Sequence, residues 1–245
     1  EVGEEDRDRL ASLLEPDRSG VQPRVGLAWR PIPGSSTVVR AGYGIYRNTN
    51  VYDSIALLLA QQPPLSTTFS VATSAERPLT LADGLVAAPG LTGQALNTVA
   101  VDPNFRVGLA QNWQASVQRD LPLSLTVSAT YLGSRGSRLI QQVLPNTSPA
   151  GAADPCPACP RGFRYLTSGG RSRRDALQLQ VRRRLRNGFS ASVEYTLAKA
   201  TDNAAGFGGA TLDAGALAQN WRDLDAEYSR SSFDRRHQVV AQAEY

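Results

Sequence analysis

The sequence is poor in the residue types that commonly build catalytic and metal sites. It has one histidine, His237, one lysine, Lys199, and two cysteines, Cys156 and Cys159. No serine or cysteine nucleophile motif accompanies His237, so no catalytic triad is indicated. Two cysteines and one distant histidine also fall short of a zinc site with ordinary ligand spacing. We therefore expect no enzyme activity, no metal and no cofactor.

The chain also lacks a run of about eighteen apolar residues, the length that a transmembrane helix needs. This absence excludes a helical span but not a β-barrel, whose signal is alternation rather than bulk hydrophobicity. The slightly negative mean hydropathy fits a barrel with a polar lumen and polar loops.

The two cysteines form the motif Cys156-Pro157-Ala158-Cys159 inside a proline-rich stretch. A thioredoxin-type redox pair lies at a helix start in an α/β context, which the surrounding sequence lacks. An extracellular loop is an oxidising setting. We therefore predict a loop disulfide between Cys156 and Cys159 that tightens a long connection.

The net charge of +4 comes almost wholly from arginine, which forms clusters at 171–174 and 182–186. Nucleic-acid domains concentrate basic and aromatic residues on one surface. Here acidic residues are interleaved throughout, so no nucleic-acid partner is expected. The first cluster falls in a predicted loop, and the second falls at a predicted turn.

The clearest positive pattern is an alternation of apolar and polar residues with a period of two. Over residues 122–133 and again over 188–199, apolar side chains fill alternate positions and mostly small polar ones stand between them. This period indicates extended strands with one apolar and one polar face. The apolar face meets another sheet in a soluble sandwich and lipid in an outer-membrane barrel, whose polar face lines the lumen.

The pattern predicts seven strands of about ten residues, the length of a tilted transmembrane strand. They are expected near 23–31, 37–47, 109–119, 122–133, 174–185, 188–199 and 236–245. Short turns join them in pairs, among them the hairpin-favouring Arg186-Asn187-Gly188. The other links, 48–108, 134–173 and 200–235, are far longer than ordinary globular loops.

Strict alternation of short periplasmic turns and long extracellular loops is typical of outer-membrane barrels. The fold class indicated is therefore all-β, an antiparallel transmembrane β-barrel segment of about seven strands. Such a number leaves two open edges, which lipid does not tolerate. We expect a piece of a larger barrel, with residues 1–21 as a loop or truncated preceding strand and residues 22–245 as a partial barrel domain.

One face of the predicted strands is expected to line the lumen. Its residues are Arg40, Gln114, Ser116, Thr126, Ser128, Gln180, Arg182, Ser192 and Glu194. On the other face Trp29, Trp113, Tyr131 and Tyr195 are expected near the strand ends, as an aromatic girdle would be. Arg183 also falls on the apolar face, but near a turn, where a charge costs little and the side chain can snorkel.

The longest link contains an apolar stretch at residues 51–62. It is too short to span a membrane as a helix. It is expected to form either a short helix over the barrel mouth or a strand that extends above the membrane.

Several motifs follow one another between residues 22 and 245. They are Pro23–Arg30, Asp102-Pro103-Asn104-Phe105-Arg106, Gln111-Asn112-Trp113, Ser116–Leu121, Tyr131-Leu132-Gly133-Ser134-Arg135-Gly136, Asp175-Ala176-Leu177-Gln178, Tyr195–Asn203 and Phe233-Asp234-Arg235-Arg236-His237. Together they resemble the barrel of Oar-like TonB-dependent transporters. Arg174 departs from that pattern, because the family usually has an aromatic residue there.

The resemblance implies a bacterial outer-membrane barrel of about 22 strands, plugged by an N-terminal domain. It implies that TonB displaces the plug and drives uptake or export of an extracellular substrate, with outer-membrane lipid and lipopolysaccharide as neighbours. The family also tends to carry a carboxypeptidase-regulatory-like domain and a TonB box. Two alternatives stay open: a surface-binding or assembly protein that uses the barrel as an anchor, and a soluble secreted β-domain.

Overall fold

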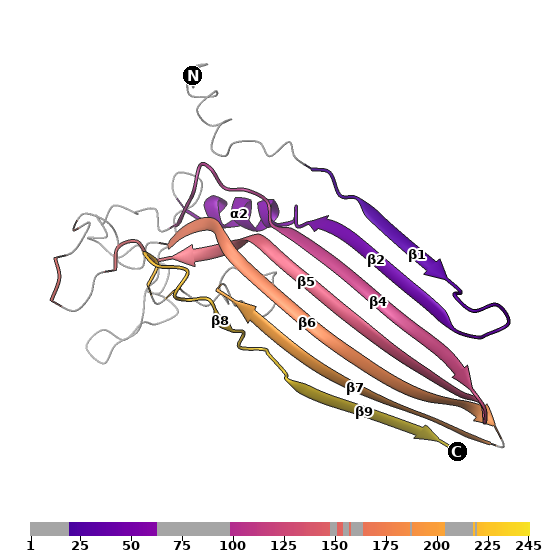
Figure 1. The fold of residues 1–245 in the computed structure, drawn as a ribbon. Coiled ribbons are helices and arrows are strands. Elements are labelled where there is room, and N and C mark those ends of the chain that lie inside the picture. The colour runs from indigo at the N-terminus through magenta and orange to yellow at the C-terminus, as the bar shows by residue number, and fades with distance from the viewer. Residues whose placement is uncertain are drawn as a thin grey trace, which may run out of the picture.

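The computed structural model describes residues 20–62, 99–147, 151–153, 157, 164–186, 188–203, 218 and 220–245. These residues form one sheet of long strands with a small cap at one end (Figure 1). The elements are β1 (Arg24–Trp29), β2 (Val38–Arg47), α2 (Val51–Ala60), β3 (Val99–Val101), β4 (Leu109–Leu121), β5 (Leu125–Val143), β6 (Arg164–Arg186), β7 (Phe189–Asp202), β8 (Ser229–Arg230) and β9 (His237–Glu244).

The order β1-β2-β4-β5-β6-β7 runs across the sheet, and both β8 and β9 pair with β7. All of these pairs are antiparallel, and only the short β3 runs parallel to its partner β6. The seven predicted strands are therefore confirmed as β1, β2, β4, β5, β6, β7 and β9, and the all-β antiparallel fold class is confirmed. The described sheet does not close on itself.

The short turns lie at one end of the sheet, as predicted. The turn between β6 and β7 joins the paired residues Arg186 and Phe189, and Gly188 has a φ of 75°, which glycine adopts without strain. The fourth strand starts later than predicted. Leu123 and Ser124 form a tight turn with φ of 65° and 61°, so β5 begins only at Leu125.

The prediction of a loop over residues 134–173 is wrong for half of that length. β5 continues to Val143 and β6 begins at Arg164, and the two stay paired beyond bulges near Arg138. Backbone pairing continues there without clean apolar alternation, because beyond a membrane neither face of the hairpin has to match lipid. The arginine cluster at 171–174 consequently lies in a strand and not in a loop.

The register separates the side chains into two faces. Paired residues share a face, and successive residues alternate. One face carries rows of apolar residues across the whole sheet, such as Val39, Val117, Ala129, Leu179, Tyr195 and Val239. We call it the apolar face, and the opposite side the polar face.

The apolar face is not covered by protein in the described part of the chain. Val117, Leu179 and Val193 lie in the middle of the sheet, yet they are 48%, 42% and 48% exposed. A soluble sandwich would bury such residues against a second sheet, and an apolar patch of this extent marks a membrane or protein contact. A single layer with one apolar and one polar face is the arrangement of a barrel wall in lipid.

Two details of the apolar face bear on the sequence predictions. The guanidinium of Arg183 lies 5.1 Å from the centre of the Phe189 ring, next to the short turn and away from the middle of the apolar rows. Tyr131 and Tyr195 lie well inside β5 and β7 and not near their ends, because both strands continue beyond the apolar rows. The predicted position of these two tyrosines at strand ends is therefore wrong.

The end opposite the short turns carries the small buried core. The apolar stretch at 51–62 was expected to form either a helix or a strand, and it forms the helix α2. Ile55, Phe105 and Leu166 are the most deeply buried residues of the cluster where α2 meets β3 and β6. The side-chain amide of Gln62 fastens α2 to β3, donating to the Val99 carbonyl at 2.9 Å and accepting from the Val99 N–H at 3.1 Å.

Cysteine labelling tests the assignment of the two faces. Val127 and Ser128 are neighbours in β5 on opposite faces, as are Ala115 and Ser116 in β4. In the protein in outer membranes, Val127→Cys and Ala115→Cys should react with a water-soluble maleimide about tenfold or more slowly than Ser128→Cys and Ser116→Cys, because apolar surroundings suppress the thiolate. Equal rates within both pairs would contradict the assignment.

Candidate functional site

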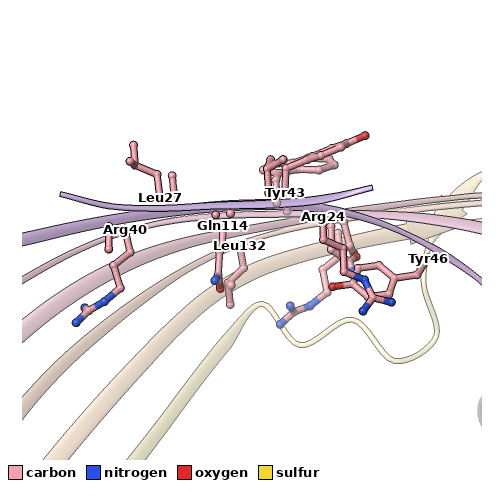
Figure 2. Close-up of a pocket in the computed structure, with 18 residues that line it drawn as sticks. Arg24, Leu27, Arg40, Tyr43, Tyr46, Gln114 and Leu132 are labelled. Atoms are coloured by element: carbon pink, nitrogen blue, oxygen red, sulfur yellow. The ribbon is translucent and has the colours of Figure 1, made fainter. Parts of the chain in front are cut away.

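The register brings together the nine residues predicted to face the lumen. All of them lie on the polar face, and Figure 2 shows Arg40 and Gln114 on the side of the sheet opposite Leu27 and Tyr43. That this face lines a lumen stays a prediction. The cross-strand pairs among them are Arg40 with Ser116, Ser128 with Gln180, Gln180 with Glu194, Thr126 with Arg182 and Arg182 with Ser192.

A hollow of about 740 Å³ lies over β1, β2, β4 and β5. Its floor is open because Gly26, Gly42 and Gly44 contribute no side chains at adjacent positions of the polar face. A Cβ on Gly42 would lie 3.5 Å from the Gln114 side chain, and one on Gly44 would lie 3.0 Å from the Tyr46 ring. These glycines therefore permit the neighbouring side chains to lie flat on the strand backbone.

Three arginines line this hollow, Arg24, Arg40 and Arg174, and no carboxylate is among its described lining residues. The Arg24 guanidinium lies 4.6 Å from the centre of the Tyr46 ring, a cation–π distance. Arg40 donates to Gln118 Oε1 at 3.1 Å. The hollow is thus a positively charged surface that can attract an anionic or polar group.

The polar face elsewhere is hydrogen-bonded but not catalytic in character. Gln178 donates to Glu194 Oε1 at 2.8 Å. Asp120 accepts from Thr126 at 2.8 Å and from Arg184 at 3.0 Å near the short turns. Among the described residues on this face, no nucleophile is aligned with a base.

Arg24, Arg174 and Tyr46 were not predicted as part of the site. The alternation itself could have found them, since Arg24 and Arg174 lie in the same row of the polar face as Asn112 and Ser134. In the sequence, Arg174 is distinctive only because the family that the chain resembles usually has an aromatic residue at this position. The structure accounts for it as a charged residue that lines the hollow.

The motif at Asp102–Arg106 forms a tight turn at the capped end. Asp102 accepts from the Asn104 N–H at 2.9 Å through its side chain and from the Phe105 N–H at 2.9 Å through its carbonyl. This turn points Phe105, 1% exposed, into the core beside Leu166. Burial and the nearby Asp102 carboxylate raise the pKa of the Tyr165 phenol.

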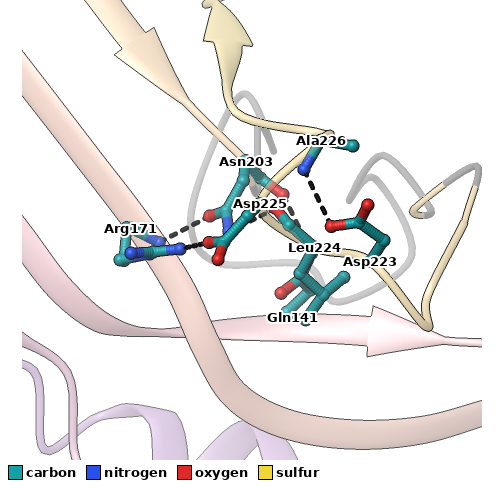
Figure 3. Close-up of polar contacts among 7 residues, drawn as sticks. All are labelled: Gln141, Arg171, Asn203, Asp223, Leu224, Asp225 and Ala226. Carbon is teal, nitrogen blue, oxygen red and sulfur yellow. Dashed lines mark hydrogen bonds and ion pairs between the residues drawn. The ribbon is translucent and has the colours of Figure 1, made fainter.

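Asn203 fastens the segment 220–228 to the β5–β6 hairpin (Figure 3). Its side-chain oxygen accepts from the Arg171 N–H at 2.6 Å, and its side-chain nitrogen donates to the Leu224 carbonyl at 3.3 Å. Its own carbonyl accepts from Gln141 Nε2 at 2.9 Å, and Arg171 forms an ion pair with Asp225. Asn203 is therefore a structural latch at the end of β7.

Asp234 fastens the approach to β9 in a similar way. Its side chain is 2% exposed and accepts from the Ala200 N–H at 2.7 Å, and Arg230 lies 3.5 Å away as an ion-pair partner. His237, at the start of β9, bonds through Nδ1 to the Tyr195 hydroxyl at 2.8 Å. The motifs at 195–203 and 233–237 thus hold the strand ends in place.

Cys156 and Cys159 lie outside the described residues, so the predicted disulfide stays a prediction. Within the described ranges, no group of three His, Cys, Asp or Glu side chains could hold a metal ion. In that same part of the chain, no helix is both long and apolar enough to cross a membrane.

A single-layered antiparallel sheet with an uncovered apolar face, short turns at one end and a capped opposite end defines the wall of an outer-membrane barrel. The model of the family described as outer membrane beta barrel domain matches residues 4–245. The chain belongs to this family, and its location is the bacterial outer membrane.

Solved structures give distant likenesses. The outer membrane transporter YddB from Escherichia coli is 12% identical, with a TM-score of 0.48, over 75% of this chain and 20% of that one. The FrpB iron transporter from Neisseria meningitidis is 12% identical, with a TM-score of 0.41, over 91% of this chain and 31% of that one. The chain thus spans a fifth to a third of these two proteins. A search of curated proteins gives no match.

Replacing Asn203 tests its role as a latch. Asn203→Ala removes two hydrogen bonds to backbone groups, which should cost about 1–3 kcal/mol of local stability. Trypsin cleavage at the exposed Arg222, inside the fastened segment, should then become roughly tenfold faster.

The cleavage rate of Asn203→Asp should lie between those of the wild type and Asn203→Ala, because the aspartate keeps the acceptor for the Arg171 N–H. Asn112→Ala is the matched control, since Asn112 lies on β4 away from the segment. Unchanged cleavage in Asn203→Ala would count against the latch.

Proposed function

We propose that this chain is part of the barrel wall of an Oar-like TonB-dependent transporter. The observation that carries the proposal is the combination of an uncovered apolar face with a polar face that holds an arginine-lined hollow. The order of the motifs between residues 22 and 245 supports the transporter subtype.

The edges of the sheet support a larger barrel. In the described residues β1 pairs only with β2, and β9 pairs only with β7, so each leaves one row of backbone groups unpaired. Such groups cost several kcal/mol each in hydrocarbon. This cost supports the proposal that further strands pair with β1 and β9, with residues 22–245 forming one part of a closed wall.

The polar face suits contact with a plug and with a hydrated substrate path. Ser116, Thr126, Ser128 and Ser192 offer small hydroxyl groups, while Arg40, Gln114, Gln180, Arg182 and Glu194 offer longer polar ones. Such a surface can form and break hydrogen bonds with a plug or a substrate, so that a plug can move without any covalent chemistry. The latched segments at the capped end would carry the extracellular contacts, and a Cys156–Cys159 disulfide would tighten the connection between β5 and β6.

An uptake comparison tests the proposal. A strain lacking the protein and the same strain complemented with the whole natural chain would be incubated in a defined nutrient mixture, and the medium followed by mass spectrometry. We expect the complemented strain alone to deplete or release at least one compound, and a protonophore to abolish this difference. Identical media would refute transport and favour the role of a surface anchor.

Bulky substitutions test which face carries the path. Ser116→Trp projects from the polar face and should slow the protonophore-sensitive flux several-fold. Ala115→Trp, its neighbour on the apolar face, should stay within about twofold of the wild type, as exposed substitutions usually do. Heat-modifiable mobility on a gel would confirm that both variants fold. Equal fluxes would contradict a substrate path along the polar face.

A further inference from the structure

The apolar face ends in a basic and aromatic surface on its capped side, opposite the short turns. Trp113 lies over Gly133, so closely that a Cβ there would overlap the indole. In the next two rows of the same face stand Arg135 and Arg173, which pair with each other, and Arg171. With Tyr228 these residues line a hollow of about 520 Å³, which we call the outer basic site.

The outer basic site lies at headgroup height if the capped end is extracellular, as the long connections indicate. Tyr131 and Leu177 form the last mainly apolar row of β5 and β6, and Tyr131 already donates its hydroxyl to Asp175 at 2.6 Å. Arg135 follows Tyr131 by four residues, roughly 13 Å along the strand. An aromatic residue followed by cations is the arrangement of a barrel surface crossing from hydrocarbon into headgroups.

The charges of the site are available to an anion. Arg135 is exposed and forms no ion pair among the described residues. Arg171 is paired with Asp225 and Arg173 with Asp175, but the two arginine side chains remain 52% and 60% exposed. Exposed ion pairs of this kind contribute only about 0–1 kcal/mol, whereas a phosphate can bind two guanidinium groups through bidentate, charge-assisted hydrogen bonds.

The outer basic site does not depend on strands outside the described sheet. It lies on β4, β5 and β6, which have strands on both sides, so closure of the barrel elsewhere leaves it unchanged. It also faces outwards, away from the arginine-lined hollow of the polar face. Lipid binding at this site therefore does not require transport. It requires only that the protein lies in the outer membrane with its capped end on the extracellular side.

We propose that the outer basic site binds the phosphorylated headgroup of an outer-leaflet glycolipid. Arg135 and Arg173 hold the phosphate, Arg171 flanks it, and Trp113 packs against the acyl chains or the sugar ring just below. The site would fix one lipid molecule against the wall beside the latched segment 220–228, since Arg171 and Asp225 belong to both.

Native mass spectrometry of the whole natural chain in detergent tests this site. The probe is lipid A with both phosphates and its two inner-core sugars, titrated against the wild type and Arg135→Gln/Arg173→Gln. We expect the double variant to bind at least about tenfold more weakly, because both charge-assisted contacts to the phosphate are lost. Lipid A stripped of its phosphates should bind both proteins equally weakly.

Arg119→Gln/Arg183→Gln is the matched control, because it makes the same charge change on the same face near the short turns. It should bind the probe like the wild type. The single variant Arg135→Gln, whose side chain has no described partner, retains the test if the double variant folds poorly. Three results would overturn the proposal: equal affinities of all variants for the phosphorylated lipid, binding of the phosphate-free lipid to the wild type as tight as that of the phosphorylated lipid, or displacement of the lipid by millimolar inorganic phosphate.

Discussion

The constraint on which the structure depends is the hydrogen bonding of backbone groups in a medium without water. In hydrocarbon each strand must give every N–H and C=O a partner on the neighbouring strand. The ladders across β1, β2, β4, β5, β6, β7 and β9 satisfy this requirement inside the sheet. They also fix the register, and the register decides which side chains meet lipid and which meet water.

The same ladder explains why the two ends of the sheet differ. At one end, tight turns are tied together, as when Ser36 Oγ accepts from the Asp120 N–H at 2.9 Å. At the other end the strands rise beyond the apolar rows and need other support, which α2, Phe105, Asn203 and Asp234 provide. The side chains of the motifs are therefore mostly structural there, and Arg171 has both a structural contact and a place in the outer basic site.

Small residues shape both charged surfaces. Gly42 and Gly44 open the hollow on the polar face, and Gly133 allows Trp113 to lie flat on the apolar face. In each case the missing Cβ places a large side chain against the backbone and leaves arginines beside it. The described wall thus has arginine-lined hollows on both of its faces.

The sequence by itself determined the strands, their pairing in hairpins and the face of each residue, because a period of two is visible wherever one side meets lipid and the other meets water. It failed at 134–143 and 164–173, where pairing continues without that contrast, and it could not choose helix or strand for 51–62. Only the tertiary structure placed Arg135 beside Arg173, Arg24 over Tyr46 and Asn203 against Leu224. These contacts join residues far apart in the chain, and register and loop docking, which depend on the whole sheet, bring them together.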